Sequence, residues 1–186
     1  MKQICVLGLG YIGLPTSSIL AAKGYQVLGV DVSRKVVDTI NSGKIHITEP
    51  DLDLFVKAAV QSGKLRASQT PEPSEAFIIS VPTPFKDGKK PDLSYVEAAT
   101  AAIIPHLQPG NLIILESTSP PQTCSHVILP LLKKAGFTPG RDIFLAHCPE
   151  RVLPGQIMRE VVENERVIGG YTPECAEKAK ELYASF

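Results

Sequence analysis

The sequence predicts an α/β fold in a single domain, built on a doubly wound, mostly parallel sheet. Short apolar runs alternate with amphipathic stretches along the chain, which is the pattern of repeated βαβ units. A glycine-rich turn separates the first apolar run from the first amphipathic stretch. The length of 186 residues suits one sizeable domain that can bury a core without disulfides or metals.

The first elements follow one another closely. Residues 4–7 (ICVL) are uniformly apolar and predict a buried parallel strand. Residues 11–23 predict a helix that is small and apolar on one side and stops at Gly24. Residues 26–30 predict a second strand that ends at Asp31. Ser33 then offers either an N-cap for a helix through residue 40 or simple turn chemistry.

The middle of the chain continues the alternation. Pro50 and Asp51 open a helix that runs to about residue 61, and residues 64–67 are a short candidate strand. Residues 76–81 predict a strand that must leave the sheet at the prolines that follow. Residues 85–91 (FKDGKKP) are polar and predict an exposed loop.

The last part completes the sheet. We expect helices at 93–104, 123–135 and 173–186. We expect strands at 111–115 and 142–146, a structured loop at 147–155, and one further possible strand at 166–168. Six or seven strands joined mostly by helices favour a Rossmann-like sheet.

The bulk composition excludes several functional classes. Lysine plus arginine and aspartate plus glutamate number 19 each, so no net field favours nucleic acid or an anionic membrane. The four cysteines lack a C-x-x-C pair, which argues against a metal site and a disulfide framework. The chain enters a strand-like run directly after Met1 and has no membrane-length apolar run, so we expect a cytoplasmic protein.

The first turn has the G-x-G-x-x-G spacing of dinucleotide-binding sites. Gly8 permits the tight turn, Gly10 allows backbone N–H groups to approach a pyrophosphate, and Gly13 allows the helix to pack on the strand. The amides of Tyr11 and Ile12 are the expected donors, supported by the positive end of the helix dipole. A glycine turn without a ligand is the alternative.

The acid at the end of the second strand predicts which dinucleotide is bound. Asp31 would accept hydrogen bonds from the adenosine ribose and repel a 2′-phosphate, which favours NAD over NADP. Its alternative role is to cap a surface turn. Arg34 and Lys35 follow closely, and an arginine there could accommodate a phosphate.

Two further strand ends and one loop carry candidate site residues. Ligands bind at the carboxyl ends of strands in open α/β sheets, so Thr83 and Thr118 could reach cofactor or substrate, or merely end their strands. In the loop after residue 147, Glu150 could order a water or act as a base. Arg151 could hold a carboxylate or phosphate, although composition alone favours a salt-bridged surface loop.

Taken together, GLGYIGLP, the Asp31 strand end, EPDL, VPTPF, ESTSPP and CPERVLPG resemble the UDP-glucose/GDP-mannose dehydrogenase family over essentially the whole chain. The resemblance implies a cytoplasmic enzyme that oxidises C6 of a UDP-sugar to a carboxylate in two steps, with two NAD⁺ and one water, for surface polysaccharide precursors. EPDL and PERVLPG favour an N-acetylmannosamine sugar. UDP-glucose and UDP-N-acetylglucosamine remain alternatives.

The resemblance also implies roles for single residues. It assigns NAD contacts to Tyr11, Ile12, Asp31, Thr83 and Thr118, and sugar-nucleotide contacts to Arg151 and Val152. Glu150 matches the acid that handles water or a proton during the oxidation. An arginine that follows the ribose-binding acid in relatives has no match, because Val36 stands in its place.

Length is the largest departure from the family pattern. Relatives continue into a central helix and a second, sugar-nucleotide-binding domain, where a Gly-Gly-x-Cys segment carries the catalytic cysteine. Cys5, Cys124, Cys148 and Cys175 follow no glycine pair, so residues 1–186 predict an NAD-binding domain that does not turn over substrate alone. The resemblance implies a homo-oligomer for the longer protein. A non-catalytic NAD-sensing module and a β-hydroxyacid-type dehydrogenase are the rival readings.

Overall fold

The computed structural model describes residues 1–185, so the expected end of the last helix at residue 186 lies outside the described residues. A seven-stranded sheet has the order β3-β2-β1-β4-β7-β8-β9. The strands are β1 (Gln3–Leu7), β2 (Gln26–Val30), β3 (Leu65–Ser68), β4 (Ala76–Ile79), β7 (Leu112–Leu115), β8 (Phe144–His147) and β9 (Gly169–Gly170). All neighbouring pairs are parallel except β8 and β9. The predicted doubly wound sheet is therefore confirmed.

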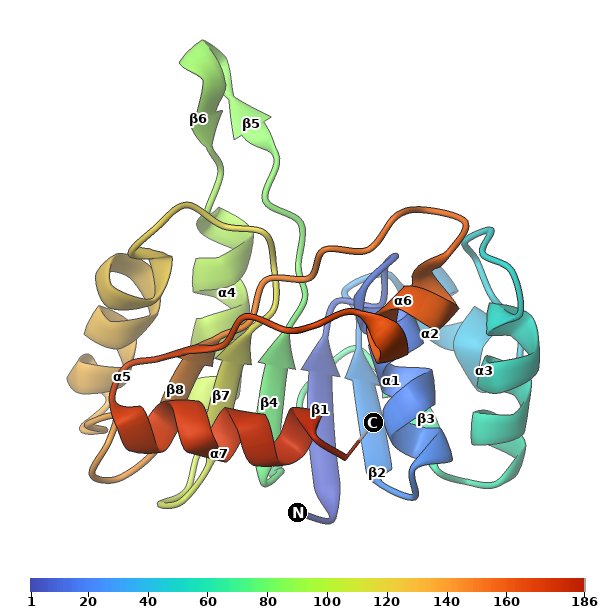
Figure 1. Cartoon of the computed structure of the whole chain (residues 1–186), viewed down its shortest axis with the longest axis horizontal. Helices are drawn as coiled ribbons and strands as arrows, with labels where there is room; N and C mark the ends of the chain where they lie inside the picture. The colour runs from blue at the N-terminus through green and yellow to red at the C-terminus, as the bar shows by residue number, and fades with distance from the viewer. Residues whose placement is uncertain (186) are drawn as a thin grey trace.

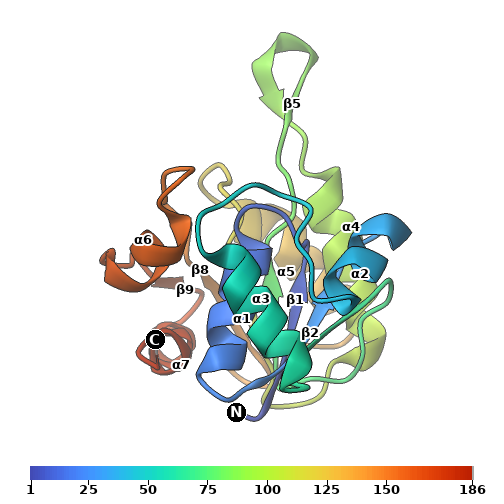
Figure 2. The ribbon, with the colours of Figure 1, turned by 90° about the vertical axis from the view of Figure 1, so that its right-hand side faces the viewer.

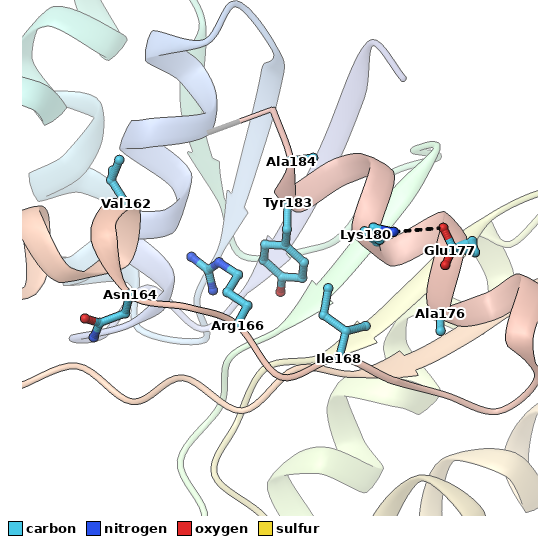
Figure 3. A pocket seen from close by; sticks show the side chains of 9 residues that line it. All are labelled: Val162, Asn164, Arg166, Ile168, Ala176, Glu177, Lys180, Tyr183 and Ala184. Carbon is cyan, nitrogen blue, oxygen red and sulfur yellow. Dashed lines mark hydrogen bonds and ion pairs between the residues drawn. The ribbon is translucent and has the colours of Figure 1, made fainter.

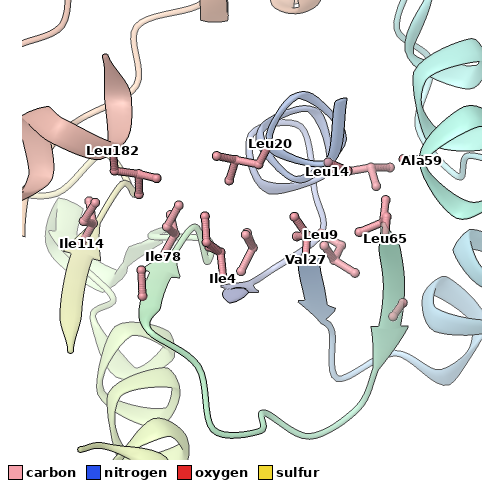
Figure 4. Packing of buried hydrophobic residues seen from close by; sticks show 14 of the residues in the cluster. Ile4, Leu9, Leu14, Leu20, Val27, Ala59, Leu65, Ile78, Ile114 and Leu182 are labelled. Atoms are coloured by element: carbon pink, nitrogen blue, oxygen red, sulfur yellow. The ribbon is translucent and has the colours of Figure 1, made fainter. Parts of the chain in front are cut away.

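Helices cover both faces of this sheet. They are α1 (Gly13–Ala22), α2 (Arg34–Asn41), α3 (Leu52–Gln61), α4 (Ser94–Ile103), η2 (Ile104–His106), η3 (Cys124–Ile128), α5 (Leu129–Lys134), α6 (Ile157–Glu163) and α7 (Pro173–Tyr183). One core cluster joins α1, α3 and α7 to the sheet, as Figure 4 shows for Leu20, Ala59 and Leu182 over Ile4 and Ile78. A second cluster packs α4 and α5 on the opposite face. Figure 2 shows α7 and α4 on opposite sides of the strands.

Several local expectations need correction. Residues 85–91 form a short antiparallel hairpin, β5 (Phe85–Lys86) and β6 (Lys90–Pro91), joined by η1 (Asp87–Lys89). It projects beyond the carboxyl ends of the strands (Figure 1). The last strand lies at Gly169–Gly170 instead of 166–168, because only these residues pair with β8.

The helix expected at 123–135 begins with the π-helical segment η3. Pro130 follows within the first turn of α5 and lacks a backbone N–H, and the wider turn ahead of it accommodates that break in the α-helical ladder. Helix α6 was not expected from the sequence. The N-cap alternative at Ser33 is confirmed, since its hydroxyl accepts the Val36 N–H at 3.4 Å.

The register of the central strands brings their carboxyl ends to one edge. Leu7 is opposite both Val30 and Ile79, and Ile79 is opposite Leu115. The residues that follow these strands therefore meet at the same edge, where the strand order reverses between β1 and β4. Ligands of doubly wound sheets bind at such a reversal point. Among residues 1–185, no helix is both long and apolar enough to cross a bilayer.

Candidate functional site

The glycine turn has the geometry that its spacing predicts. Gly8 adopts φ +90°, a left-handed conformation that costs glycine little, and its N–H donates to the Val30 carbonyl at 2.8 Å. A side chain at Gly8 would meet the Ser80 carbonyl oxygen at 2.5 Å. The chain is therefore held close between β2 and β4 at the start of the turn.

The other two glycines differ in what surrounds them. A methyl group at Gly13 would clash with the Gly8 carbonyl, so this glycine allows the close packing of α1 on the turn. A methyl group at Gly10 would meet nothing within 4 Å. The space beside Gly10 is open, and within residues 1–185 no backbone hydrogen bond occupies the N–H groups of Tyr11 and Ile12. This arrangement suits a pyrophosphate at the N-terminus of α1.

Asp31 is tied to the turn by its carboxylate. Its Oδ2 accepts the Leu9 N–H at 3.1 Å and its Oδ1 accepts the Ser33 N–H at 2.9 Å. Each carboxylate oxygen has two lone pairs, so both oxygens can still accept from a ribose hydroxyl. Arg34 is exposed and lies 3.5 Å from Asp38, one turn further along α2.

A cleft of about 390 Å³ brings the predicted cofactor residues together. Gly13 does not line it, but the other predicted cofactor residues do, namely Gly8, Gly10, Tyr11, Ile12, Asp31, Thr83 and Thr118. The Thr83 hydroxyl donates to the Thr118 carbonyl at 2.5 Å, which joins the two turns after β4 and β7. Ser80 and Ser117 line the same cleft and were not expected. Ser80 lies at the end of the predicted strand 76–81, and Ser117 directly precedes Thr118. Their positions at strand ends are the signal that could have found them.

An apolar slot of about 300 Å³ adjoins this cleft and shares Gly8, Asp31, Val81 and Pro82 with it. The residues that it adds come from α4 and the turns after β2 and β3, and they include Val32, Gln69, Pro71, Tyr95, Ala98 and Ala102. The slot has the apolar character that an adenine ring requires. The only sequence signal for this slot is the spacing of alanines along α4, and the same spacing is typical of ordinary helix packing.

The loop after β8 lies beside the cleft. The Glu150 N–H donates to the Glu116 carbonyl at 3.3 Å, and its carboxylate is paired with Arg166 at 2.9 Å. Arg151 is exposed and its guanidinium donates to the Glu165 carbonyl at 2.7 Å. Val152 packs against the small cluster of Ile19, Ile157 and Val161. Arg151 and Val152 therefore do not line the glycine-turn cleft.

Sequence reasoning missed a buried carboxylate at the same edge. Glu116 follows β7 and has no exposed surface. Burial raises its pKa to about 6, against the opposing effects of the Ser80 hydroxyl and Arg166. Tyr183 donates its hydroxyl to Glu116 at 3.1 Å, and burial followed by the Glu116 charge raises the pKa of that phenol. Arg166 stacks on the Tyr183 ring, 4.4 Å from its centre (Figure 3).

All four cysteines are free thiols. Burial raises the pKa of Cys5 and Cys124 to about 12. Burial also raises the pKa of Cys148, the cysteine nearest the loop that carries Glu150. A nucleophilic cysteine needs a lowered pKa and access to substrate, so none of these three is suited to that role.

Comparison with known proteins agrees with this geometry. Residues 2–186 match the model of the UDP-glucose/GDP-mannose dehydrogenase family, NAD binding domain. The NDP-N-acetyl-D-galactosaminuronic acid dehydrogenase of Ralstonia nicotianae is 54% identical over 192 residues, covering 100% of this chain and 45% of the relative. The UDP-N-acetyl-D-mannosamine dehydrogenase of Campylobacter jejuni is 52% identical over 193 residues, covering 100% and 47%.

Solved structures give the same result. The UDP-N-acetyl-mannosamine dehydrogenase of Staphylococcus aureus has a TM-score of 0.97 and 48% identity, covering 100% of this chain and 45% of that one. The GDP-mannose dehydrogenase of Pseudomonas aeruginosa has a TM-score of 0.93 and 29% identity, with 100% and 44% covered. The chain thus spans slightly less than half the length of these relatives. The predictions of the resemblance and of NAD as the dinucleotide are confirmed.

Proposed function

The chain belongs to the UDP-glucose/GDP-mannose dehydrogenase family, and from this premise we propose that it is the NAD-binding part of a UDP-sugar 6-dehydrogenase. The substrate proposed is UDP-N-acetyl-D-mannosamine, converted with two NAD⁺ and one water to the uronate and two NADH. The observation that carries the proposal is the convergence of the glycine turn, Asp31, Thr83 and Thr118 on one cleft at the strand-order reversal.

Each residue has a role that its surroundings support. The N–H groups of Tyr11 and Ile12 would hold the pyrophosphate in the open space beside Gly10. Asp31 would bind the ribose hydroxyls. Thr83 and Thr118 line the same cleft, and their turns would orient the nicotinamide. NAD, when bound, supplies the hydride acceptor for the oxidation.

Glu150 is the proposed acid of the site. Its carboxylate is almost fully buried and held by Arg166 and the Arg151 N–H, at 2.9 and 2.7 Å. Such a fixed carboxylate can order a water or hold a proton during the oxidation. The Arg151 side chain and Val152 would contact the sugar nucleotide.

The nucleophile would come from outside these residues. The thiols of Cys5, Cys124 and Cys148 have raised pKa values and lie buried or half-buried, and Cys175 is fully buried. The covalent step would therefore use a cysteine in the part of the family that this chain does not span. We therefore propose that residues 1–186 bind NAD but do not oxidise the sugar unaided.

Calorimetric titration of the chain tests this proposal. NAD⁺ and NADH should bind, NADPH should bind more weakly, and UDP-N-acetyl-D-mannosamine with NAD⁺ should yield no NADH. Equal or tighter binding of NADPH would overturn the role of Asp31, and turnover by this chain would overturn the requirement for a further cysteine. The longer protein, given the sugar nucleotide, should release two NADH per sugar.

The identity of the sugar has one specific rival. The 54% identical relative is named NDP-N-acetyl-D-galactosaminuronic acid dehydrogenase, so N-acetyl-D-galactosamine is the second candidate for the sugar. Comparing turnover of UDP-N-acetyl-D-mannosamine, UDP-N-acetyl-D-galactosamine and UDP-glucose by the longer protein distinguishes these substrates. A cytoplasmic location and a homo-oligomeric longer protein remain parts of the proposal, the former supported by the four free thiols.

A further inference from the structure

We propose that Glu116 is a positioning residue that couples the dinucleotide cleft to the Arg166–Glu150 ion pair. The inference rests on the proposed function, because it links the site for NAD to the carboxylate proposed to act on water or a proton. Glu116 itself does not line the cleft. It acts through the side chains on either side of it.

The Glu116 carboxylate joins three segments that are distant in the sequence. Its Oε2 accepts the Ser80 hydroxyl at 2.7 Å and the Thr16 hydroxyl at 3.3 Å. Its Oε1 accepts the Tyr183 hydroxyl at 3.1 Å. The end of β4, helix α1 and helix α7 therefore meet on one buried group, and all three hydroxyls donate to it.

The first connection leads to the cleft. Ser80 lines the cleft, and its main chain packs against Gly8, where an added side chain would meet the Ser80 carbonyl. The Ser80 side chain also lies close to Gly13, where an added Cβ would be 3.2 Å from the Ser80 Cβ. A ligand that fixes the glycine turn therefore also fixes Ser80, and through its hydroxyl one oxygen of Glu116.

The second connection leads to the loop. Tyr183 carries Arg166 on the face of its ring, as Figure 3 shows. Arg166 donates to the Glu150 carboxylate at 2.9 Å and to the Val161 carbonyl at 2.7 Å. The main chain of Glu116 adds a second route, since its carbonyl accepts the Glu150 N–H. The position of the Glu150 carboxylate thus depends on groups that Glu116 holds.

The chemistry of Glu116 favours this role over a filler of the core. Burying a carboxylate costs desolvation free energy, and an apolar side chain of similar size often stabilises the folded state as well or better. Here the carboxylate lies among three donors and near the Arg166 charge, which lowers its pKa against the larger effect of burial. A network of this kind has few alternative arrangements, and a change at one end is passed to the other.

The test is the nuclear magnetic resonance signal of the Arg166 guanidinium N–H group in ¹⁵N-labelled chain titrated with NAD⁺. In the unaltered chain, the Arg166 signal should move on saturation with NAD⁺. In Glu116→Gln the movement should be lost, whereas the matched control Glu181→Gln, on the exposed side of α7, should behave as the unaltered chain. Movement that persists in Glu116→Gln, or no movement in the unaltered chain when NAD⁺ binds, would overturn the coupling.

Two single-hydroxyl variants keep the inference falsifiable if Glu116→Gln does not fold. Ser80→Ala breaks the connection to the cleft and Tyr183→Phe breaks the connection to Arg166. Their effects on the NAD⁺ dissociation constant should depart from additivity by more than about threefold in the double variant, and additive effects would overturn the coupling. If the unaltered chain binds no NAD⁺, the proposed function itself fails. If NAD⁺ binds without these couplings, only the present inference fails.

Discussion

The Glu49 carboxylate accepts the Gly155 N–H at 2.8 Å, across 106 positions of sequence. Its other oxygen accepts the Ile157 N–H at 2.7 Å, so Glu49 caps the start of α6. The EPDL and PERVLPG segments, which carried the resemblance as separate motifs, therefore form one structural unit. Glu49 is 4% exposed, and its removal would leave the buried Ile157 N–H and the part-buried Gly155 N–H without an acceptor.

Replacement of Glu49 should loosen the loop before α6 without disrupting the glycine-turn cleft. Glu49→Ala leaves the Gly155 and Ile157 N–H groups unpaired, and we expect a loss of about 3 kcal/mol in the free energy of unfolding. Glu49→Gln keeps one acceptor oxygen and should lose less. Urea denaturation measures both, and hydrogen exchange should increase first in α6. Unchanged exchange in α6 would contradict the role of Glu49 as its cap.

The glycine turn offers a sharp contrast between two similar substitutions. Gly13→Ala forces a methyl group against the Gly8 carbonyl, so we expect a loss of about 3 kcal/mol in the free energy of unfolding. Gly10→Ala meets no atom and should change stability by less than about 0.5 kcal/mol. The same methyl group would fill the space proposed for the pyrophosphate and should weaken NAD⁺ binding about tenfold or more.

Thermal unfolding and NAD⁺ titration of both variants separate these effects. The two variants control for each other, since each adds one methyl group to the same turn. Normal NAD⁺ affinity in Gly10→Ala would show that the pyrophosphate does not lie against this glycine.

The residues of the cleft could be predicted from local sequence, whereas the hairpin could not. The turn, Asp31 and the two threonines were found because each follows a strand, and parallel strands align their carboxyl ends without any long-range knowledge. The hairpin after Pro84 was missed because its strands have only two residues each. A polar run of that length carries no period by which a strand could be recognised.

The buried network was missed for a different reason. Tyr183 lies 67 positions from Glu116, and Arg166 lies 16 positions from Glu150. The Glu150 carboxylate pairs with Arg166, whereas the side chain of the adjacent Arg151 donates to the Glu165 carbonyl. Which acid meets which base depends on how α7 crosses the sheet, and no local pattern contains that information.

Asp31 should determine the preference between the two dinucleotides. Asp31→Asn removes the charge that repels a 2′-phosphate and weakens hydrogen bonds to the ribose, which are worth about 2 kcal/mol each when the acceptor is charged. We expect the affinity for NADH to fall. The ratio of the NADPH dissociation constant to the NADH dissociation constant should decrease at least tenfold, since about 1.4 kcal/mol corresponds to a factor of ten. Asp38→Asn, beside Arg34 on the surface of α2, is the matched control. An unchanged preference in Asp31→Asn would show that another group excludes NADPH.

Glu116 should make the stability of the chain depend on pH in a defined window. Its pKa is about 6 when folded and 4.5 as the reference for an unfolded chain, so the folded state binds the proton more tightly. The stabilisation from this proton is complete below pH 4.5 and is lost as the pH rises through about 6. The loss amounts to about 2 kcal/mol.

The glutamine of Glu116→Gln cannot ionise, so the free energy of unfolding of this variant should not show the pH-dependent loss that Glu116 causes. Relative to the unaltered chain, the variant should gain about 2 kcal/mol as the pH rises from below 4.5 to above 6. Urea denaturation at each pH measures this difference, with Glu181→Gln as the exposed control. The sign is decisive, because a carboxylate held chiefly by ion pairing would have a lowered pKa, and Glu116→Gln would then lose stability over the same range. If Glu116→Gln loses stability relative to the unaltered chain as the pH rises, the effect of Arg166 and the three hydroxyls on the pKa of Glu116 is larger than the effect of burial.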